Sequence, residues 1–134
     1  MPIELLCVGL AGVLLLVQIM VAAAPRAMAS GLSWAASPRD TPAAPVSSRA
    51  QRADRALRNM GETFPVFAAA AIAVVVADAT TPTTAIGAQL YLAGRVVYVP
   101  TYLFHVPLVR SLIWAAAMLG LVLVLTPFVS ALFG

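Results

Sequence analysis

The residue types that could do chemistry gather in two stretches of this chain. The first, at residues 49–67, holds arginines at three-residue intervals followed by an amide and a carboxylate: Arg49, Arg52, Arg55, Arg58, Asn59 and Glu62. On a helix, Arg55, Asn59 and Glu62 would share one face, and Arg52 would extend that face by about one turn. Because a carboxylate at the edge of an apolar segment is costly unless it is paired, we expect Arg55 or Arg58 to partner Glu62.

The second stretch is the apolar segment 84–102, which carries an arginine among tyrosines. Its polar residues stand at i, i+4, i+7 and i+11, which is again one helical face: Tyr91, Arg95, Tyr98 and Tyr102. Arg110 follows at the start of the next apolar segment. Arginines bind carboxylates as planar forks and a glutamate binds an ammonium group, so the two stretches together suit an anionic or zwitterionic ligand.

The composition indicates a membrane protein. Of the 134 residues, 62% are hydrophobic and 10% are charged, whereas soluble domains carry about 25% charged residues. The basic residues lie near the ends of apolar segments rather than on a soluble basic face, which argues against a nucleic-acid partner. Cys7 is the single cysteine, so an intrachain disulfide and a cysteine metal cluster are excluded, and we predict no metal site.

Four apolar segments must position these residues, and we predict helices at about 3–24, 49–78, 84–102 and 111–133. Helices of this length are sufficient to cross about 30 Å of hydrocarbon. The residues between the first two helices, 25–48, include four prolines and are predicted to form an irregular connection. The predicted fold class is therefore all-α, an integral membrane four-helix bundle that forms a single domain over residues 1–134 and contacts lipid.

The positions of the arginines predict the orientation in the membrane. Six of the eight lie in the first connection and the first turns of the second helix, the third connection carries Arg110, and the second connection carries none. An excess of arginine marks cytoplasmic connections, so residues 25–48 and 103–110 are predicted to be cytoplasmic, with both termini on the opposite side. The first segment has no arginine or lysine ahead of its apolar run and exceeds the length of a signal peptide's apolar core, so we expect it to be retained.

The residues alone leave other functions open. Glu62 and Arg95 could neutralise each other as an interhelical ion pair, in a non-catalytic membrane protein whose other arginines only set the topology. A transporter would need a polar path across the whole bilayer, and the polar residues here stop in the cytoplasmic half, which argues against that class.

Two motifs resemble one known family. The pattern RxxRAxxNxxExxPxF, from Arg52 to Phe67, resembles the signature of the MAPEG family, the membrane-associated proteins in eicosanoid and glutathione metabolism. LYLAGRVVYVPTY, from Leu90 to Tyr102, is similar to the third helix of that family, and HVPLVRSLIW is similar to bacterial members. The resemblance implies a bacterial inner-membrane protein that assembles as a homotrimer and binds glutathione between protomers near the cytoplasmic face.

The resemblance also implies roles for individual residues. It implies that glutathione binds to Arg52, Arg55, Asn59, Glu62, Arg95, Tyr98 and Tyr102. Arg110 is the candidate catalytic residue, because it lies near, though offset from, the position of the arginine that stabilises the glutathione thiolate in family enzymes. The implied reaction transfers glutathione to lipophilic electrophiles, or reduces peroxides with it, the substrate entering from the bilayer. Thr63 departs from the pattern, because several members place a tyrosine there and one ligand hydroxyl is lost.

Overall fold

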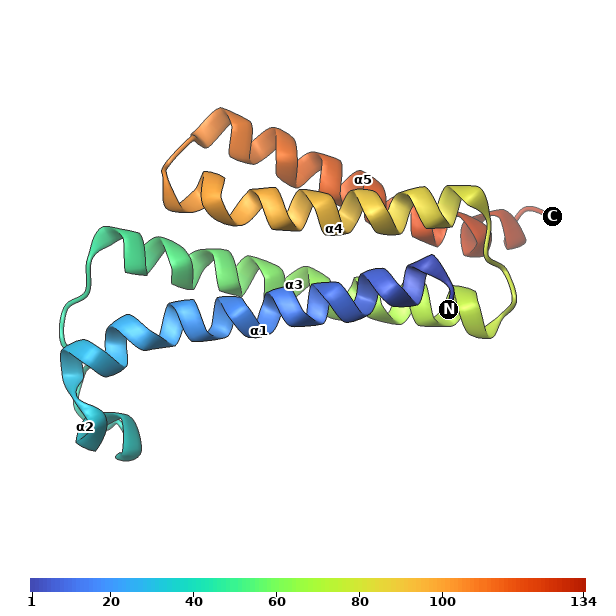
Figure 1. The fold of residues 1–134 in the computed structure, drawn as a ribbon. Helices are drawn as coiled ribbons and strands as arrows, with labels where there is room; N and C mark the ends of the chain where they lie inside the picture. Colours follow the sequence, from blue (N-terminus) through green and yellow to red (C-terminus); the bar gives the residue numbers. More distant parts are fainter.

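The computed structural model describes all of residues 1–134 and contains helices but no strands. The helices are α1 (Ile3–Ser30), α2 (Leu32–Ala36), α3 (Ser48–Val76), α4 (Pro82–Leu103) and α5 (Pro107–Ala131). The four long helices lie side by side, and the short α2 turns away from the end of α1 (Figure 1). Both termini lie at one end of this bundle, and the connections that follow α1 and α4 lie at the other end (Figure 1).

Three of the helices, α1, α3 and α5, are long and apolar enough to cross a membrane. The fourth, α4, has 22 residues but carries glutamine, arginine, threonine and tyrosine side chains, which lower its mean hydropathy. The arginine of α4, Arg95, is only 1% exposed, because α4 packs against α5, α1 and α3. The chain is thus an all-α membrane bundle, in which α4 buries Arg95, Tyr91 and Tyr98 and leaves Gln89 exposed.

The helix boundaries differ from the predicted ones mainly around the prolines. The first helix continues past its predicted end at Ala24 to Ser30, with Pro25 inside it. A proline removes one backbone donor without preventing the next turn from forming. The helix ends instead at Gly31, whose φ of 85° lies in the region that favours glycine. The irregular connection predicted for 25–48 therefore covers only residues 37–47.

Prolines and threonines also set the starts of α4 and α5. Thr81 and Thr84 form a capping box, in which each side chain bonds the backbone N–H of the other, so α4 begins at Pro82. The last helix begins at Pro107 rather than at Ser111, because a proline fits the first helical position, where no backbone donor is needed. The Thr84 hydroxyl also donates to Glu4 Oε1 at 2.6 Å, which ties α1 to α4 where both helices begin.

Glycines bring α4 and α5 into backbone contact. A Cβ atom on Gly87 would lie 2.7 Å from the carbonyl oxygen of Gly120, and one on Gly120 would lie 2.6 Å from the carbonyl oxygen of Gly87. A further Cβ on Gly94 would lie 2.9 Å from the Cβ of Ala117. Small residues at such a crossing allow close helix packing where the surrounding lipid supplies no hydrophobic driving force. This contact fixes α5, and with it Arg110, relative to α4.

We predict that Gly120→Ala lowers the thermal unfolding midpoint by several degrees, because the added methyl group would overlap backbone atoms of α4 and overpacking costs about 1–3 kcal/mol. Gly9→Ala is the matched control, since nothing lies within 4 Å of a Cβ built there. Thermal unfolding in detergent compares the two variants, and equal midpoints would contradict the close contact between α4 and α5.

Candidate functional site

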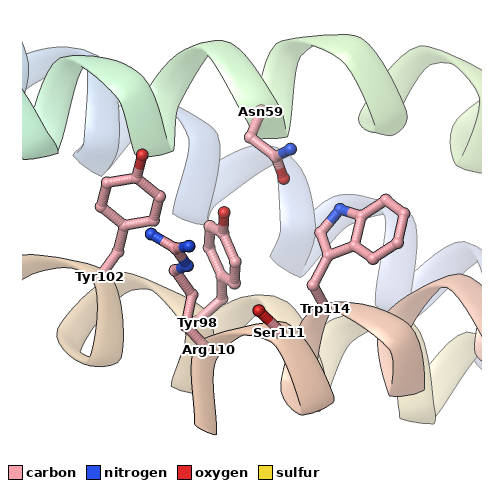
Figure 2. A pocket seen from close by; sticks show the side chains of 6 residues that line it. All are labelled: Asn59, Tyr98, Tyr102, Arg110, Ser111 and Trp114. Carbon is pink, nitrogen blue, oxygen red and sulfur yellow. The ribbon is translucent and has the colours of Figure 1, made fainter. Parts of the chain in front are cut away.

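A polar cleft lies between α3, α4 and α5 near the end of the bundle that holds the connections. One cavity of about 270 Å³ is lined by Asn59, Tyr98, Tyr102, Arg110, Ser111 and Trp114 (Figure 2). A second cavity of about 250 Å³ is lined by Arg55, Arg58, Asn59, Glu62, Tyr98 and Tyr102. The two cavities share the amide and the two tyrosines, so we treat them as one site and call it the polar cleft.

Helical spacing explains how each element supplies its side chains. Arg55, Asn59 and Glu62 recur every three or four residues along α3 and therefore point to the same side. Tyr98 and Tyr102 do the same on α4, with their rings 5.5 Å apart. Of the eight residues that the family resemblance assigns to the site, the structure brings together six: Arg55, Asn59, Glu62, Tyr98, Tyr102 and Arg110.

Arg110 projects from the first turns of α5 into the cleft. Its guanidinium carbon lies 4.9 Å from the centre of the Tyr102 ring, a cation–π distance. Figure 2 shows the guanidinium beside the rings of Tyr98 and Tyr102. No carboxylate lies within ion-pair distance of it, since the ion pairs of this protein all involve Asp54. Its N–H groups are therefore free to bind an anion.

Arg52 and Arg95 do not line the polar cleft. Arg52 donates to the carbonyl oxygen of Leu103 at 3.2 Å, so it binds one of the last carbonyls of α4 and joins the ends of α3 and α4. Arg95 is buried beneath the cleft, with its guanidinium carbon 5.3 and 5.5 Å from the ring centres of Tyr91 and Tyr98. Both arginines thus use their guanidinium groups in contacts between α3 and α4.

Buried Arg95 joins α4 to α3 through two hydrogen bonds. Its Nη1 donates to Asn59 Oδ1 at 2.7 Å, and its Nη2 donates to Thr63 Oγ1 at 2.6 Å. The Thr63 hydroxyl also shares a hydrogen bond of 3.0 Å with the hydroxyl of Tyr91. The ring of Tyr91 stacks on Phe67 with centres 4.0 Å apart, which continues this contact into the core. Thr63 therefore holds Arg95 in place. This role was not predicted from the sequence, where Thr63 was considered only as a position at which a tyrosine hydroxyl is lost.

Glu62 pairs neither with Arg55 or Arg58, the partners expected for it, nor with Arg95, the alternative left open. Arg58 pairs instead with Asp54 at 3.0 Å. Glu62 is exposed at the cleft, and its carboxylate has no hydrogen-bond partner in the protein. Asp54 and Glu62 lie four residues before and four residues after Arg58, so Arg58 can reach either carboxylate. In the structure it pairs with Asp54, on the preceding turn. Within this chain, the ion pair of Glu62 with Arg95 is therefore absent.

Asp54 was not singled out in the sequence, yet it is the main ionic contact between α1 and α3. Arg26 donates from Nη1 and Nη2 to the two carboxylate oxygens at 3.0 and 2.9 Å. Asp54 precedes the apolar part of α3, and hydrogen bonding from Arg26 is the main reason why its pKa is held below the usual value. Only the continuation of α1 past Pro25 brings Arg26 within reach.

Two further residues of the cleft were also missed. Ser111 and Trp114 follow Arg110 on α5 and line the same cavity (Figure 2). The Ser111 hydroxyl donates to the carbonyl oxygen of Pro107 at 3.0 Å. The spacing from Arg110 to Trp114 is one helical turn, which is the signal that could have identified the indole.

The fold and the cleft define a class: a helical membrane protein with a polar, mostly basic site near one end of its bundle. The model of the MAPEG family matches residues 3–128, nearly the whole chain. The chain belongs to the MAPEG family. No curated protein and no solved structure matches the chain.

We predict that Glu62 and Arg95 are energetically independent in the protein without ligand, because Glu62 is exposed and unpaired whereas Arg95 bonds Asn59 and Thr63. Glu62→Gln should leave the unfolding midpoint unchanged, and its effect should be the same in the Arg95→Leu background. Thermal unfolding of both single variants and the double variant measures the coupling, which should stay within about 0.5 kcal/mol. A double variant that recovers the stability lost by Arg95→Leu would restore the ion-pair interpretation.

Proposed function

We propose that the polar cleft binds glutathione and that the protein transfers it to lipophilic electrophiles, or reduces lipophilic peroxides with it. One observation carries the proposal: charged groups of both signs, Arg55, Glu62 and Arg110, lie on the same cleft without ionic partners in the chain. Charged side chains that the protein leaves exposed and unpaired remain available to groups of opposite charge on a ligand. The family to which the chain belongs is associated with glutathione, which supports this choice of ligand.

The chemistry of glutathione matches the distribution of these charges. The tripeptide carries carboxylates, an ammonium group and a thiol. An arginine such as Arg55 binds a carboxylate with two parallel hydrogen bonds, and Glu62 can bind the ammonium group. The hydroxyls of Tyr98 and Tyr102 can hydrogen-bond the peptide. This arrangement leaves the cavity of Arg110 for the thiol.

Arg110 would then activate the thiol for reaction. A neighbouring guanidinium favours the thiolate, which is the reactive nucleophile. The thiolate sulfur forms a bond to the electrophilic carbon of the second substrate, and the leaving group departs with the displaced electron pair. Trp114 is 40% exposed and gives the same cavity an apolar wall, which suits a substrate dissolved in lipid.

A second candidate is a non-catalytic membrane protein with a structural polar network. The hydrogen bonds of Arg95 with Asn59 and Thr63 favour it, because they join two helices without any ligand. It does not account for Arg110, whose guanidinium has only the Tyr102 ring as a partner. We therefore prefer the glutathione-dependent function.

The expected result is that purified protein binds glutathione in a calorimetric titration and conjugates it to 1-chloro-2,4-dinitrobenzene. Arg110→Leu should retain binding but lower kcat by about a hundredfold, as expected when a stabilising charge is removed from the reacting group. Arg39→Leu is the control, because Arg39 stacks on Trp34 and does not line the cleft. Absence of glutathione binding by the wild-type protein would overturn the proposal.

We further propose a homotrimer in a bacterial inner membrane, with the cleft on the cytoplasmic side. Support comes from an apolar groove on the outer face of the bundle, lined by Pro65, Val66, Ala69, Ala70, Ala73, Leu125 and Phe128. Ala69 and Ala73 are exposed there, although small residues spaced by four favour close helix contact. Native mass spectrometry in mild detergents should detect the trimer, and a monomer in every detergent would refute it.

A cysteine at Ser37 should resist impermeant reagents in intact cells if the cleft is cytoplasmic.

A further inference from the structure

The side-chain amide of Asn59 has a defined orientation. A guanidinium has only donors, so the group that Arg95 Nη1 contacts at 2.7 Å must be the amide oxygen. The amide nitrogen of Asn59 is then left with its N–H groups, for which the protein offers no acceptor. Asn59 lines both cavities of the polar cleft, and Figure 2 shows its amide reaching from α3 into the cleft, with the nitrogen on the side of Trp114.

Thr63 holds the Arg95 guanidinium in the position in which it bonds the amide oxygen of Asn59. The threonine hydroxyl accepts from Nη2 at 2.6 Å, so the two terminal nitrogens of the guanidinium are each bonded to a different residue of α3. The hydroxyl of Tyr91 lies 3.0 Å from the same oxygen and holds it in place. With both nitrogens bonded, the guanidinium cannot turn without breaking one of these hydrogen bonds.

We propose that Arg95 and Thr63 are positioning residues, which turn the Asn59 amide so that the polar cleft presents N–H donors to a negatively charged acceptor group of its ligand. The inference rests on the function proposed above and changes the role of Arg95 within it. Arg95 is 1% exposed, so in this structure it acts on a ligand through Asn59 rather than by contact. Thr63, which departs from the tyrosine of several family members, becomes a residue of the site.

The charge of Arg95 sets the chemical class of the group that binds at Asn59. No carboxylate of the chain pairs with Arg95, because the ion pairs of the protein involve only Arg26, Asp54 and Arg58. Its Nε–H is also buried without a partner. An unneutralised cation directly behind an amide donor favours an anionic acceptor in the cleft, because water screens the charge of buried Arg95 less than that of an exposed arginine. In glutathione, that acceptor is a carboxylate.

Calorimetric titration with glutathione tests the positioning role. Thr63→Val, which removes the hydroxyl and retains the shape, should weaken binding by about tenfold, the usual effect of a lost hydrogen bond to a charged group. Thr63→Ser retains the hydroxyl and should bind within about twofold of wild type. Because Thr63 acts through Asn59, the double variant Asn59→Ala, Thr63→Val should bind no more weakly than Asn59→Ala alone. Additive losses, or unchanged binding by Thr63→Val, would overturn the proposal.

A second measurement needs no ligand. Asn59→Asp places a carboxylate against Arg95 and removes the amide donor, so the unfolding midpoint without glutathione should rise by about 4 °C or more while glutathione binding falls. Asn59→Ala is the matched control and should show no such rise. If the unfolding midpoint of Asn59→Asp is at or below that of wild type, the inference that Arg95 lacks a counter-charge is wrong. If the wild-type protein binds no glutathione, the proposed function fails, and this ligand-free comparison still decides whether Arg95 lacks a counter-charge.

Discussion

The site depends on a guanidinium buried between two helices. A charge inside an apolar bundle is tolerated only when polar groups surround it, and α3 supplies two of them to Arg95, the amide oxygen of Asn59 and the hydroxyl of Thr63. The rings of Tyr91 and Tyr98 cover the guanidinium. These contacts set how α3 and α4 lie against each other at the depth where the polar cleft opens, so the geometry of the cleft follows from the burial of this one charge.

The third wall of the cleft is placed by a different constraint. The backbones of α4 and α5 touch at Gly87 and Gly120, where no side chain separates them. Because helices are stiff, this contact also determines where the first turns of α5 lie, and Arg110 reaches the ring of Tyr102 as a result. Hydrogen bonds of Arg95 therefore fix α4 against α3, whereas glycines without side chains allow α5 to pack closely on α4.

The charges of this half of the protein fall into two groups with different environments. Arg26 and Arg58 are neutralised by Asp54, and together these residues join α1 to α3. Arg55, Glu62 and Arg110 border the cleft without partners. The first group joins two helices of the bundle, whereas the second group forms no ion pair within the chain. That contrast, rather than the number of arginines, supports the proposal that the cleft binds a ligand.

Periodicity and composition alone determined that the chain is a helical membrane protein, and they determined which residues share a helical face, because both properties depend on neighbours along the chain. The sequence motifs also indicated the family. Only the tertiary structure determined which charges pair. Arg58 pairs with Asp54 and not with Glu62, and Arg95 is buried against Thr63 instead of lining the cleft. The continuation of α1 past Pro25, which brings Arg26 to Asp54, was decided there as well. A helical repeat gives the direction of a side chain around its own axis, but the partner of a long, flexible arginine depends on the distance and rotation of the neighbouring helix, which close packing of the whole bundle determines.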